Sequence, residues 1–124
     1  MTKIKRSADC GNSPKNQLVE NLAVALATGD RDTVSALVTD DVQWTIAGGD
    51  EIAGRESMLA ALEEQWSSEP DTLIIHHVVT HGRAGAVDGT VTLGDRTVRF
   101  CDVFDFSSTK GTAVGRILSY RVAL

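Results

Sequence analysis

The spacing of hydrophobic positions predicts helices in the first half of the chain. A helix should begin at Ser13-Pro14, because serine caps free amide groups and proline suits the first helical turn. Gly29 should end it, and Asp30 should cap a second short helix. The apolar stripes of these two helices are Leu18, Leu22, Ala25 and Leu26, then Val34, Leu37 and Val38.

One strand and a third helix complete this half. Residues 42–46 alternate between apolar and polar side chains, which predicts a half-buried strand ending at Gly48-Gly49. Residues 55–66 predict an amphipathic helix that Pro70 cannot continue. Its apolar face is Met58, Leu59, Leu62 and Trp66.

Four β-runs follow, at residues 72–81, 84–93, 96–106 and about 113–124. Gly94-Asp95 between two alternating runs is typical of a two-residue hairpin turn. If Leu93 pairs with Arg96, then Val87 lies opposite Asp102, because paired positions keep a constant sum. Asp102 should therefore share an apolar face with Val98, Phe100, Phe104 and Phe106.

Asp102 is the main candidate for a catalytic residue. Burying a charged, unpaired carboxylate on an apolar sheet face costs several kcal/mol of free energy. Asp102 must therefore be protonated, paired with another group or hydrated. Burial raises a carboxyl pKa and yields an acid or base that works nearer neutral pH. The alternative is a structural aspartate bonded to a core partner or a backbone amide.

Two aromatic residues are further candidates. Tyr120 belongs to the more apolar alternation of the last run, with Leu118 and Val122, and its hydroxyl could reach a ligand or Asp102. A core tyrosine bonded to the backbone is the alternative. Trp44 should form part of a cavity wall and of the core together with Ile46.

His76 is a third catalytic candidate, as a second acid or base. It should face the interior beside Val87 if Gly82-Arg83 forms a two-residue turn, with a surface histidine as the alternative. The neighbouring His77 should point to the opposite face, so the two histidines cannot share a metal ion. We expect no metal site.

Length and composition indicate one domain. The 124 residues, 42% hydrophobic and 23% charged, suit a single globular core. Residues 1–12 lack periodicity and are expected to be a disordered tail before one domain at residues 13–124. Cys10 and Cys101 cannot build a disulfide framework, and no signal peptide or membrane span is visible, so we expect a cytoplasmic protein.

Charge and motifs narrow the partners. The net charge of −5 argues against binding to nucleic acid and disfavours anionic partners. No Gly-rich phosphate loop or nucleophile elbow is present, so we expect neither a nucleotide cofactor nor a covalent hydrolase mechanism. No cofactor and no membrane partner are expected.

Several short motifs occur in a familiar order: Gly29-Asp30, then TDDVQW at 39–44, IAGRE at 52–56, CDVFDF at 101–106 and GRILSYR at 115–121. Together they resemble the nuclear transport factor 2-like superfamily, in particular its SnoaL-like and ketosteroid-isomerase-like branch. The resemblance implies an α+β fold: a cone-shaped, cystatin-like curved antiparallel sheet, closed by three N-terminal helices around an apolar pocket, and often dimeric.

The resemblance also assigns positions. Asp102 falls where ketosteroid isomerases keep an oxyanion-hole aspartic acid, whereas Ile46 and Leu22 replace the isomerase's general base and tyrosine. Ordinary ketosteroid isomerisation is therefore rejected. The expected lining of a pocket for a small apolar organic ligand is Trp44, Ile46, Leu22, Met58, Ala61, Leu62, Val87, Gly89, Phe100, Phe104, Leu118 and Val122.

Two functional hypotheses remain open. The first is a cofactor-free isomerase, cyclase or hydrolase in which Asp102 moves a proton and Tyr120 or His76 assists. The second is a non-catalytic ligand-binding or assembly domain. The apolar run at 73–79 further predicts a homodimer formed through the sheet.

Overall fold

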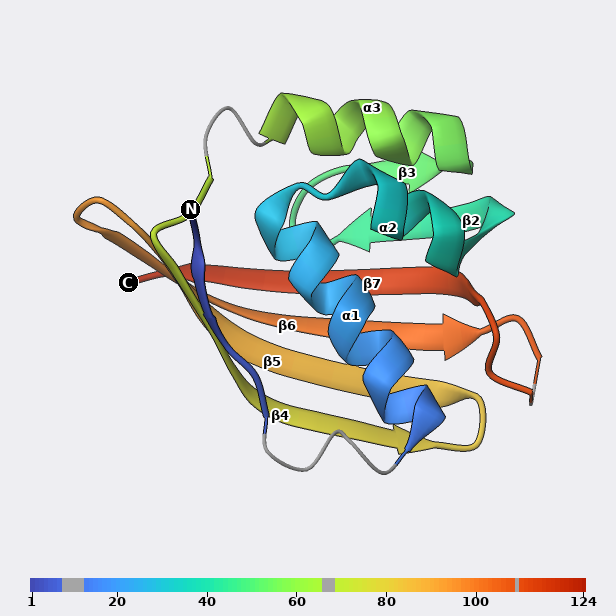
Figure 1. Ribbon diagram of the computed structural model, residues 1–124. Helices are drawn as coiled ribbons and strands as arrows, with labels where there is room; N and C mark the ends of the chain where they lie inside the picture. Colours follow the sequence, from blue (N-terminus) through green and yellow to red (C-terminus); the bar gives the residue numbers. More distant parts are fainter. Residues whose placement is uncertain (8–12, 66–68, 109) are drawn as a thin grey trace.

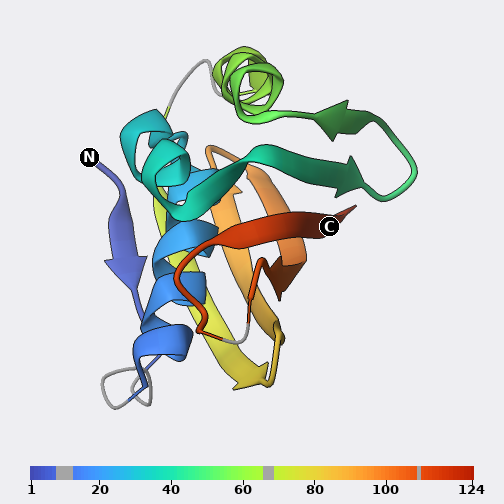
Figure 2. The ribbon, with the colours of Figure 1, turned by 90° about the vertical axis from the view of Figure 1, so that its right-hand side faces the viewer.

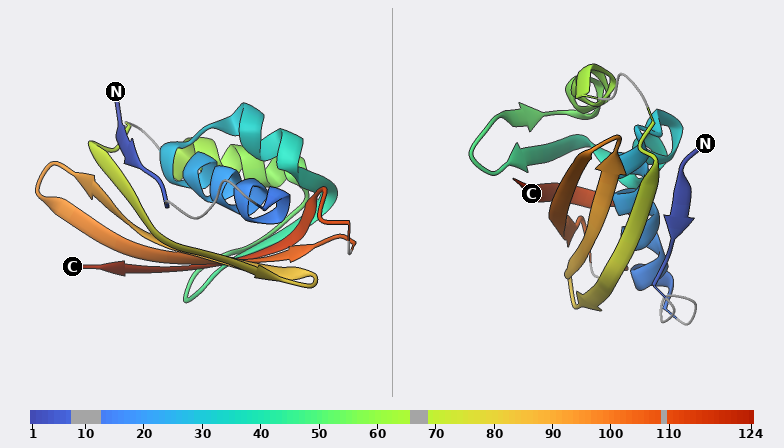
Figure 3. Two further views of the ribbon diagram at one scale, coloured as in Figure 1. Left: turned by 60° about the horizontal axis from the view of Figure 1, so that its bottom comes forward. Right: turned by 90° about the vertical axis from the view of Figure 1, so that its left-hand side faces the viewer.

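One curved sheet with helices on its concave side forms the fold (Figures 1 and 3). The structure, a computed structural model, describes residues 1–7, 13–65, 69–108 and 110–124. Within these residues the strand order is β1-β4-β5-β6-β7-β2-β3, and α1, α2 and α3 cover the concave side. The expected α+β cone of curved, unclosed sheet with three helices is confirmed.

The first two helices begin and end where their capping residues predict. Ser13 accepts a hydrogen bond from the Asn16 amide at 3.2 Å, and α1 runs from Pro14–Thr28. Gly29 takes the left-handed conformation that ends it (φ 74°), and Asp30 caps α2, Arg31–Leu37. No helix in the described residues is long and apolar enough to cross a lipid bilayer.

The third helix is α3, Arg55–Gln65. Its predicted last residue, Trp66, lies outside the described residues. Met58 and Leu62 are fully buried beneath this helix, as the apolar stripe predicts.

The central strands match the predicted ranges. These are β4 (Thr72–His81), β5 (Ala84–Leu93), β6 (Arg96–Phe106) and β7 (Val114–Ala123). Leu93 pairs with Arg96 and Val87 with Asp102, so the predicted hairpin register is confirmed. Gly94 supplies the positive φ of 60° that the turn requires.

The last two strands in the sheet order depart from the prediction. β2 spans Val38–Ile46, so Val38, expected on a helix, already belongs to a strand. β3, Glu51–Ala53, was not predicted; it pairs antiparallel with β2, as Figure 2 shows. Three residues are too few to display a period-two pattern.

The N-terminal segment is also partly ordered. β1, Lys3–Lys5, pairs parallel with β4, and the Thr2 hydroxyl donates to the Pro70 carbonyl at 2.6 Å. The expectation of a disordered tail is wrong for these residues, and residues 8–12 lie outside the described residues. All three β1 side chains are exposed, so the strand is held by its backbone and leaves no hydrophobic pattern.

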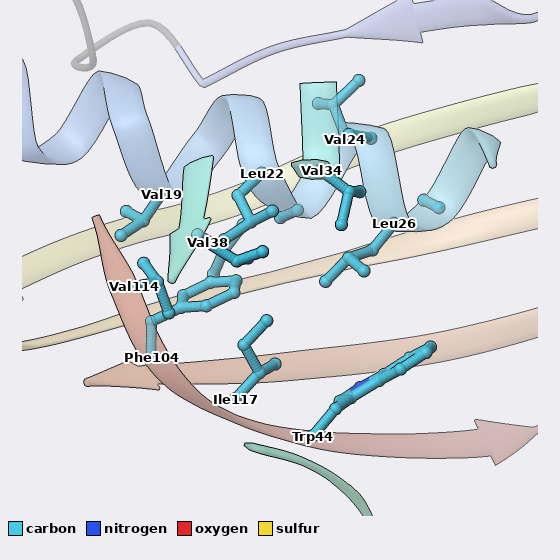
Figure 4. Close-up of a cluster of buried hydrophobic side chains, with 14 of the residues drawn as sticks. Val19, Leu22, Val24, Leu26, Val34, Val38, Trp44, Phe104, Val114 and Ile117 are labelled. Atoms are coloured by element: carbon cyan, nitrogen blue, oxygen red, sulfur yellow. The ribbon is translucent and has the colours of Figure 1, made fainter. Parts of the chain in front are cut away.

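The core lies between α1 and the concave face of the sheet (Figure 4). Trp44, Phe104, Leu22 and Ile117 have no exposed surface. They come from four different elements and fill the middle of the cone.

Candidate functional site

The inward face of three adjacent strands brings Asp102 together with two polar residues of β7. Asp102 on β6 lies between Val87 on β5 and Ser119 on β7. The neighbouring inward row contains Gly89, Phe100 and Arg121. Ser119 and Arg121 therefore face the same side of the sheet as Asp102.

A buried hydrogen-bond chain ends at the Asp102 carboxylate. The Trp44 indole Nε1 donates to the Ser119 Oγ at 2.9 Å, and that hydroxyl donates to Asp102 Oδ1 at 2.6 Å. An indole N–H can only donate, and a hydroxyl has one proton, so the direction of the chain is fixed. Ser119 and Trp44 have no exposed surface. One carboxylate oxygen is thereby held in place.

Burial dominates the acid–base behaviour of Asp102. The side chain is 2% exposed. Loss of water raises its pKa from 3.8 to about 6, while the hydrogen bond from Ser119 and the charge of Arg121 act in the opposite direction. The carboxyl can therefore both hold and release a proton near neutral pH.

Arg121 contributes a positive charge next to Asp102. Its Nη1 donates to Gln65 Oε1 at 3.1 Å, and its guanidinium carbon lies 5.8 Å from the centre of the Trp44 ring. Burial lowers the pKa of the guanidinium and the nearby Asp102 raises it. Arginine stays charged at neutral pH despite such shifts.

Asp102 and Arg121 line a cavity of about 330 Å³, within the range of small-molecule sites. The cavity lies near the β5–β6 turn and includes residues at the ends of α1 and α3; Figure 1 shows both helices ending on this side. Its other lining residues are Leu26, Ala27, Gln65, Val91, Leu93, Arg96, Val98 and Phe100.

Most of the predicted lining residues instead fill the core. Phe100 lines the cavity, as expected. Gly89 offers no space, because a methyl group there would lie 2.7 Å from the Phe100 ring. The pocket expected among these residues is thus corrected to a cavity near the hairpin end. Predicted lining residues found in or against the core are Leu22, Trp44, Ile46, Met58, Ala61, Leu62, Val87 and Phe104.

Tyr120 does not face Asp102. It pairs with Cys101 on the outer face of the sheet and is 45% exposed. Leu118 and Val122 lie on the same outer face. The inward orientation predicted for these three residues is wrong, because the more apolar alternation of β7 faces outward and the alternation with Ser119 and Arg121 faces inward.

His76 also lies on the outer face. The turn at Gly82-Arg83 has two residues, as assumed, and His81 pairs with Ala84. A β-bulge at His76 then shifts the register, so that His76 and His77 both point outward. His76 Nε2 contacts Thr90 Oγ1 at 2.8 Å, and His77 Nδ1 contacts Asp88 Oδ1 at 2.9 Å. The expectation that His76 faces the interior is wrong.

Sequence reasoning missed the polar partners of Asp102. The sequence predictions include neither Ser119 nor Arg121 as a site residue. A buried carboxylate needs a hydrogen-bonding or charged partner. Ser119 and Arg121 are the polar residues of one alternation of β7, so this need could have indicated that this alternation faces Asp102. The apolar lining residues Val91, Leu93 and Val98 sit on the hairpin whose register was predicted.

The fold of the chain is similar to that of several solved structures. Among solved structures, an NTF-2-like protein of unknown function from Burkholderia xenovorans LB400 is similar, with a TM-score of 0.72 and 18% identity over 86% of this chain and 81% of that one. A protein from Shewanella denitrificans OS-217 classed as a SnoaL-like polyketide cyclase gives 0.71 and 16%, over 89% and 92%. An LEH-like epoxide hydrolase from M. tuberculosis gives 0.67 and 24%, over 87% and 82%. These likenesses show the nuclear transport factor 2-like fold.

The family follows from the sequence. Residues 19–114 match the model of the SnoaL-like domain, so the chain belongs to the SnoaL-like domain family. The resemblance stated from the motifs is confirmed. No curated protein sequence matches this chain significantly.

Proposed function

We propose that this SnoaL-like domain is a cofactor-independent enzyme in which Asp102 transfers a proton on a small, largely apolar substrate. The observation that carries this proposal is a buried carboxylate with a pKa of about 6 on the wall of a cavity that is otherwise mostly apolar. Perturbed carboxyl groups in cavities are typical of acid–base catalysts.

The neighbouring residues suit proton abstraction next to a carbonyl group. Asp102 takes the proton from the carbon next to the carbonyl group; the electron pair of the broken C–H bond forms a C=C bond, and the π electrons of the C=O bond move to the oxygen. Arg121 stabilises the negative charge that develops on this oxygen. Protonated Asp102 then returns the proton to the same or another carbon. Ser119 holds Oδ1 of Asp102, which leaves Oδ2 for the transfer.

Reaction types consistent with this arrangement are isomerisation, cyclisation and hydrolysis. Similar structures include one classed as a polyketide cyclase and one named as an epoxide hydrolase, which gives this range support at the level of the fold. Ketosteroid isomerisation is not proposed, because Leu22 is fully buried and apolar where the isomerase resemblance requires a tyrosine.

The test combines binding with turnover. Small apolar ketones, epoxides, phenols and polyketide-like acids are screened by thermal shift, since a ligand of the native state raises Tm. Compounds that bind are assayed for turnover with wild type and Asp102→Asn. We expect turnover to fall by about a hundredfold or more in the variant while binding persists. Equal turnover in both proteins would remove Asp102 from the mechanism.

A second candidate function, assembly into a homodimer, is supported by the outer face of the sheet. Val79, Tyr120 and Val122 are at least 45% exposed there, next to residues of both charges such as Asp88 and Arg99. A two-fold interface requires such a self-complementary surface. We propose that a second copy of the chain covers this face. Light scattering should give twice the monomer mass for wild type and the monomer mass for Val122→Glu; a monomeric wild type would contradict the proposal.

A further inference from the structure

The charge of the cavity differs from the charge of the whole chain. The chain has a formal net charge of −5, which disfavours anionic partners in general. The charged residues that line the cavity are Arg96, Arg121 and Asp102. Two arginines and one aspartate give this surface a local excess of positive charge even when Asp102 is ionised.

Arg121 has unused hydrogen-bonding capacity. Among the described residues, no carboxylate oxygen lies within the 4.0 Å of its guanidinium that an ion pair requires, and the hydrogen bond found goes to neutral Gln65. A guanidinium carries five N–H donors in a rigid, planar fork. The charge of Asp102 acts on this partly buried guanidinium from the next row, but the two groups form no ion pair. The fork is thus ready to bind a planar anion.

Most of the remaining lining residues of the cavity are apolar. Arg121 lies opposite Phe100, and Val98 lies one inward row nearer the hairpin turn. Successive inward rows are about 6.6 Å apart at roughly 3.3 Å per residue. Val91 pairs with Val98, and Leu26 lines the same cavity. A ligand with one charged end and an apolar body of a few carbon atoms would match this distribution.

We propose that the ligand is a small apolar monocarboxylate, whose carboxylate binds Arg121 while its hydrocarbon body contacts Val91, Val98 and Leu26. This inference deepens the proposed function and rests on the cavity being a small-molecule site. Arg96, which is exposed at the start of β6, attracts the anion to the entrance.

The negative charge of Asp102 restricts the ligand to one negative charge. Its carboxyl lies one row from Arg121 on the adjacent strand, so a second negative charge on the ligand would be repelled. A carboxylate matches the planar fork of Arg121 through two parallel hydrogen bonds. A dianionic phosphate ester is therefore disfavoured relative to a carboxylate.

The test uses three matched pairs of probes: benzoate and benzamide, cyclohexanecarboxylate and its amide, and octanoate and octanamide. Dissociation constants are measured by calorimetry with wild type, Arg121→Gln and the control Arg116→Gln. Arg116 is an exposed arginine of the same strand on the outer face. We expect at least one acid to bind wild type about tenfold or more tightly than its amide.

The variants assign that preference to a residue. Arg121→Gln should weaken binding of the acid by about ten- to a hundredfold and change amide binding by less than about twofold. Arg116→Gln should change neither. If Arg121→Gln does not fold, Arg121→Lys serves instead; it keeps the charge without the fork and should lose about tenfold of the acid's affinity.

Failure of this inference differs from failure of the proposed function. Amides that bind as tightly as their acids, or a failure of all three acids to bind, would overturn the monocarboxylate proposal without touching the role of Asp102. Acid binding that depends on Arg121, together with no difference in turnover between wild type and Asp102→Asn, would support the ligand class and overturn the catalytic proposal.

Discussion

The concave face of β6 has two ends that differ although they belong to one strand. Phe104 has no exposed surface and packs among core side chains of α1 and β7 (Figure 4). Val98 and Phe100, nearer the hairpin turn, border the cavity. The amino-acid types are similar, so hydrophobicity alone does not decide which end is filled. The position of the helix ends decides which part is filled, because α1 ends at Thr28 near the cavity and does not cover the strand beyond it.

The largest expected effect tests the filled end. Phe104→Ala should lower the free energy of unfolding by about 3–5 kcal/mol, because it creates a void in close-packed surroundings. The matched variant Val98→Ala removes a half-buried side chain from the cavity wall and should cost less than about 1.5 kcal/mol. Urea unfolding measures both. Similar losses for the two variants would contradict the distinction between the ends.

Asp102→Asn tests the charge between the two ends. The pKa of Asp102 is raised in the folded state, so the folded protein binds this proton more tightly than the unfolded chain. Wild-type stability should therefore fall as pH rises from about 4 to about 6 and level off above that. Asparagine avoids the buried charge, so at about pH 8 the variant should be more stable by something on the order of 3 kcal/mol.

The pH dependence separates this explanation from a structural one. Near pH 4 wild type and Asp102→Asn should have nearly equal free energies of unfolding, because Asp102 is then protonated in the folded state. Urea titrations across this range provide the measurement. An Asp102→Asn variant that is less stable at about pH 8 would mean that Asp102 contributes mainly as a structural acceptor.

Ser119→Ala tests the hydrogen-bond chain. Loss of this hydroxyl leaves Trp44 Nε1 and Asp102 Oδ1 without their partner and should cost about 1–3 kcal/mol. The pKa of Asp102 should rise further, since the hydrogen bond from Ser119 lowers it. Urea unfolding at several pH values should show a larger loss above this pKa than below it. A loss independent of pH would point to packing alone.

The smallest effect concerns the outer face. Tyr120→Phe should leave turnover unchanged within about twofold, because Tyr120 points away from the cavity, and stability should change by less than about 0.5 kcal/mol. Steady-state assays and thermal unfolding measure these quantities. A loss of turnover of about tenfold or more would mean that Tyr120 takes part in catalysis, which its outward orientation does not predict.

Local chemistry made much of the fold predictable. Ser13, Gly29 and Asp30 defined helix ends, and Gly94 defined a turn whose register placed Asp102 on the inner face. Each of these signals depends on a backbone conformation that few residue types favour.

The errors arose where tertiary pairing overrode local pattern. The bulge at His76 has no local signature, and it reversed the face expected for this histidine. On β7 the outward residues Leu118, Tyr120 and Val122 are more hydrophobic than inward Ser119 and Arg121, so the apolar alternation predicted the wrong face. A functional site requires polar residues on the inner face of the sheet, and the hydrophobic pattern of the sequence does not predict such residues there.

The short strand β1 has a consequence for solubility. Without it, the free edge of the sheet would be β4, a ten-residue strand with the apolar run Leu73, Ile74 and Ile75 directly after its first residue. Exposed edges of this kind pair with strands of other molecules. β1 covers the part of β4 from Thr72 to Ile74, and presents a three-residue edge with lysines at both ends. The first residues of the chain thus protect the monomer against strand-to-strand aggregation.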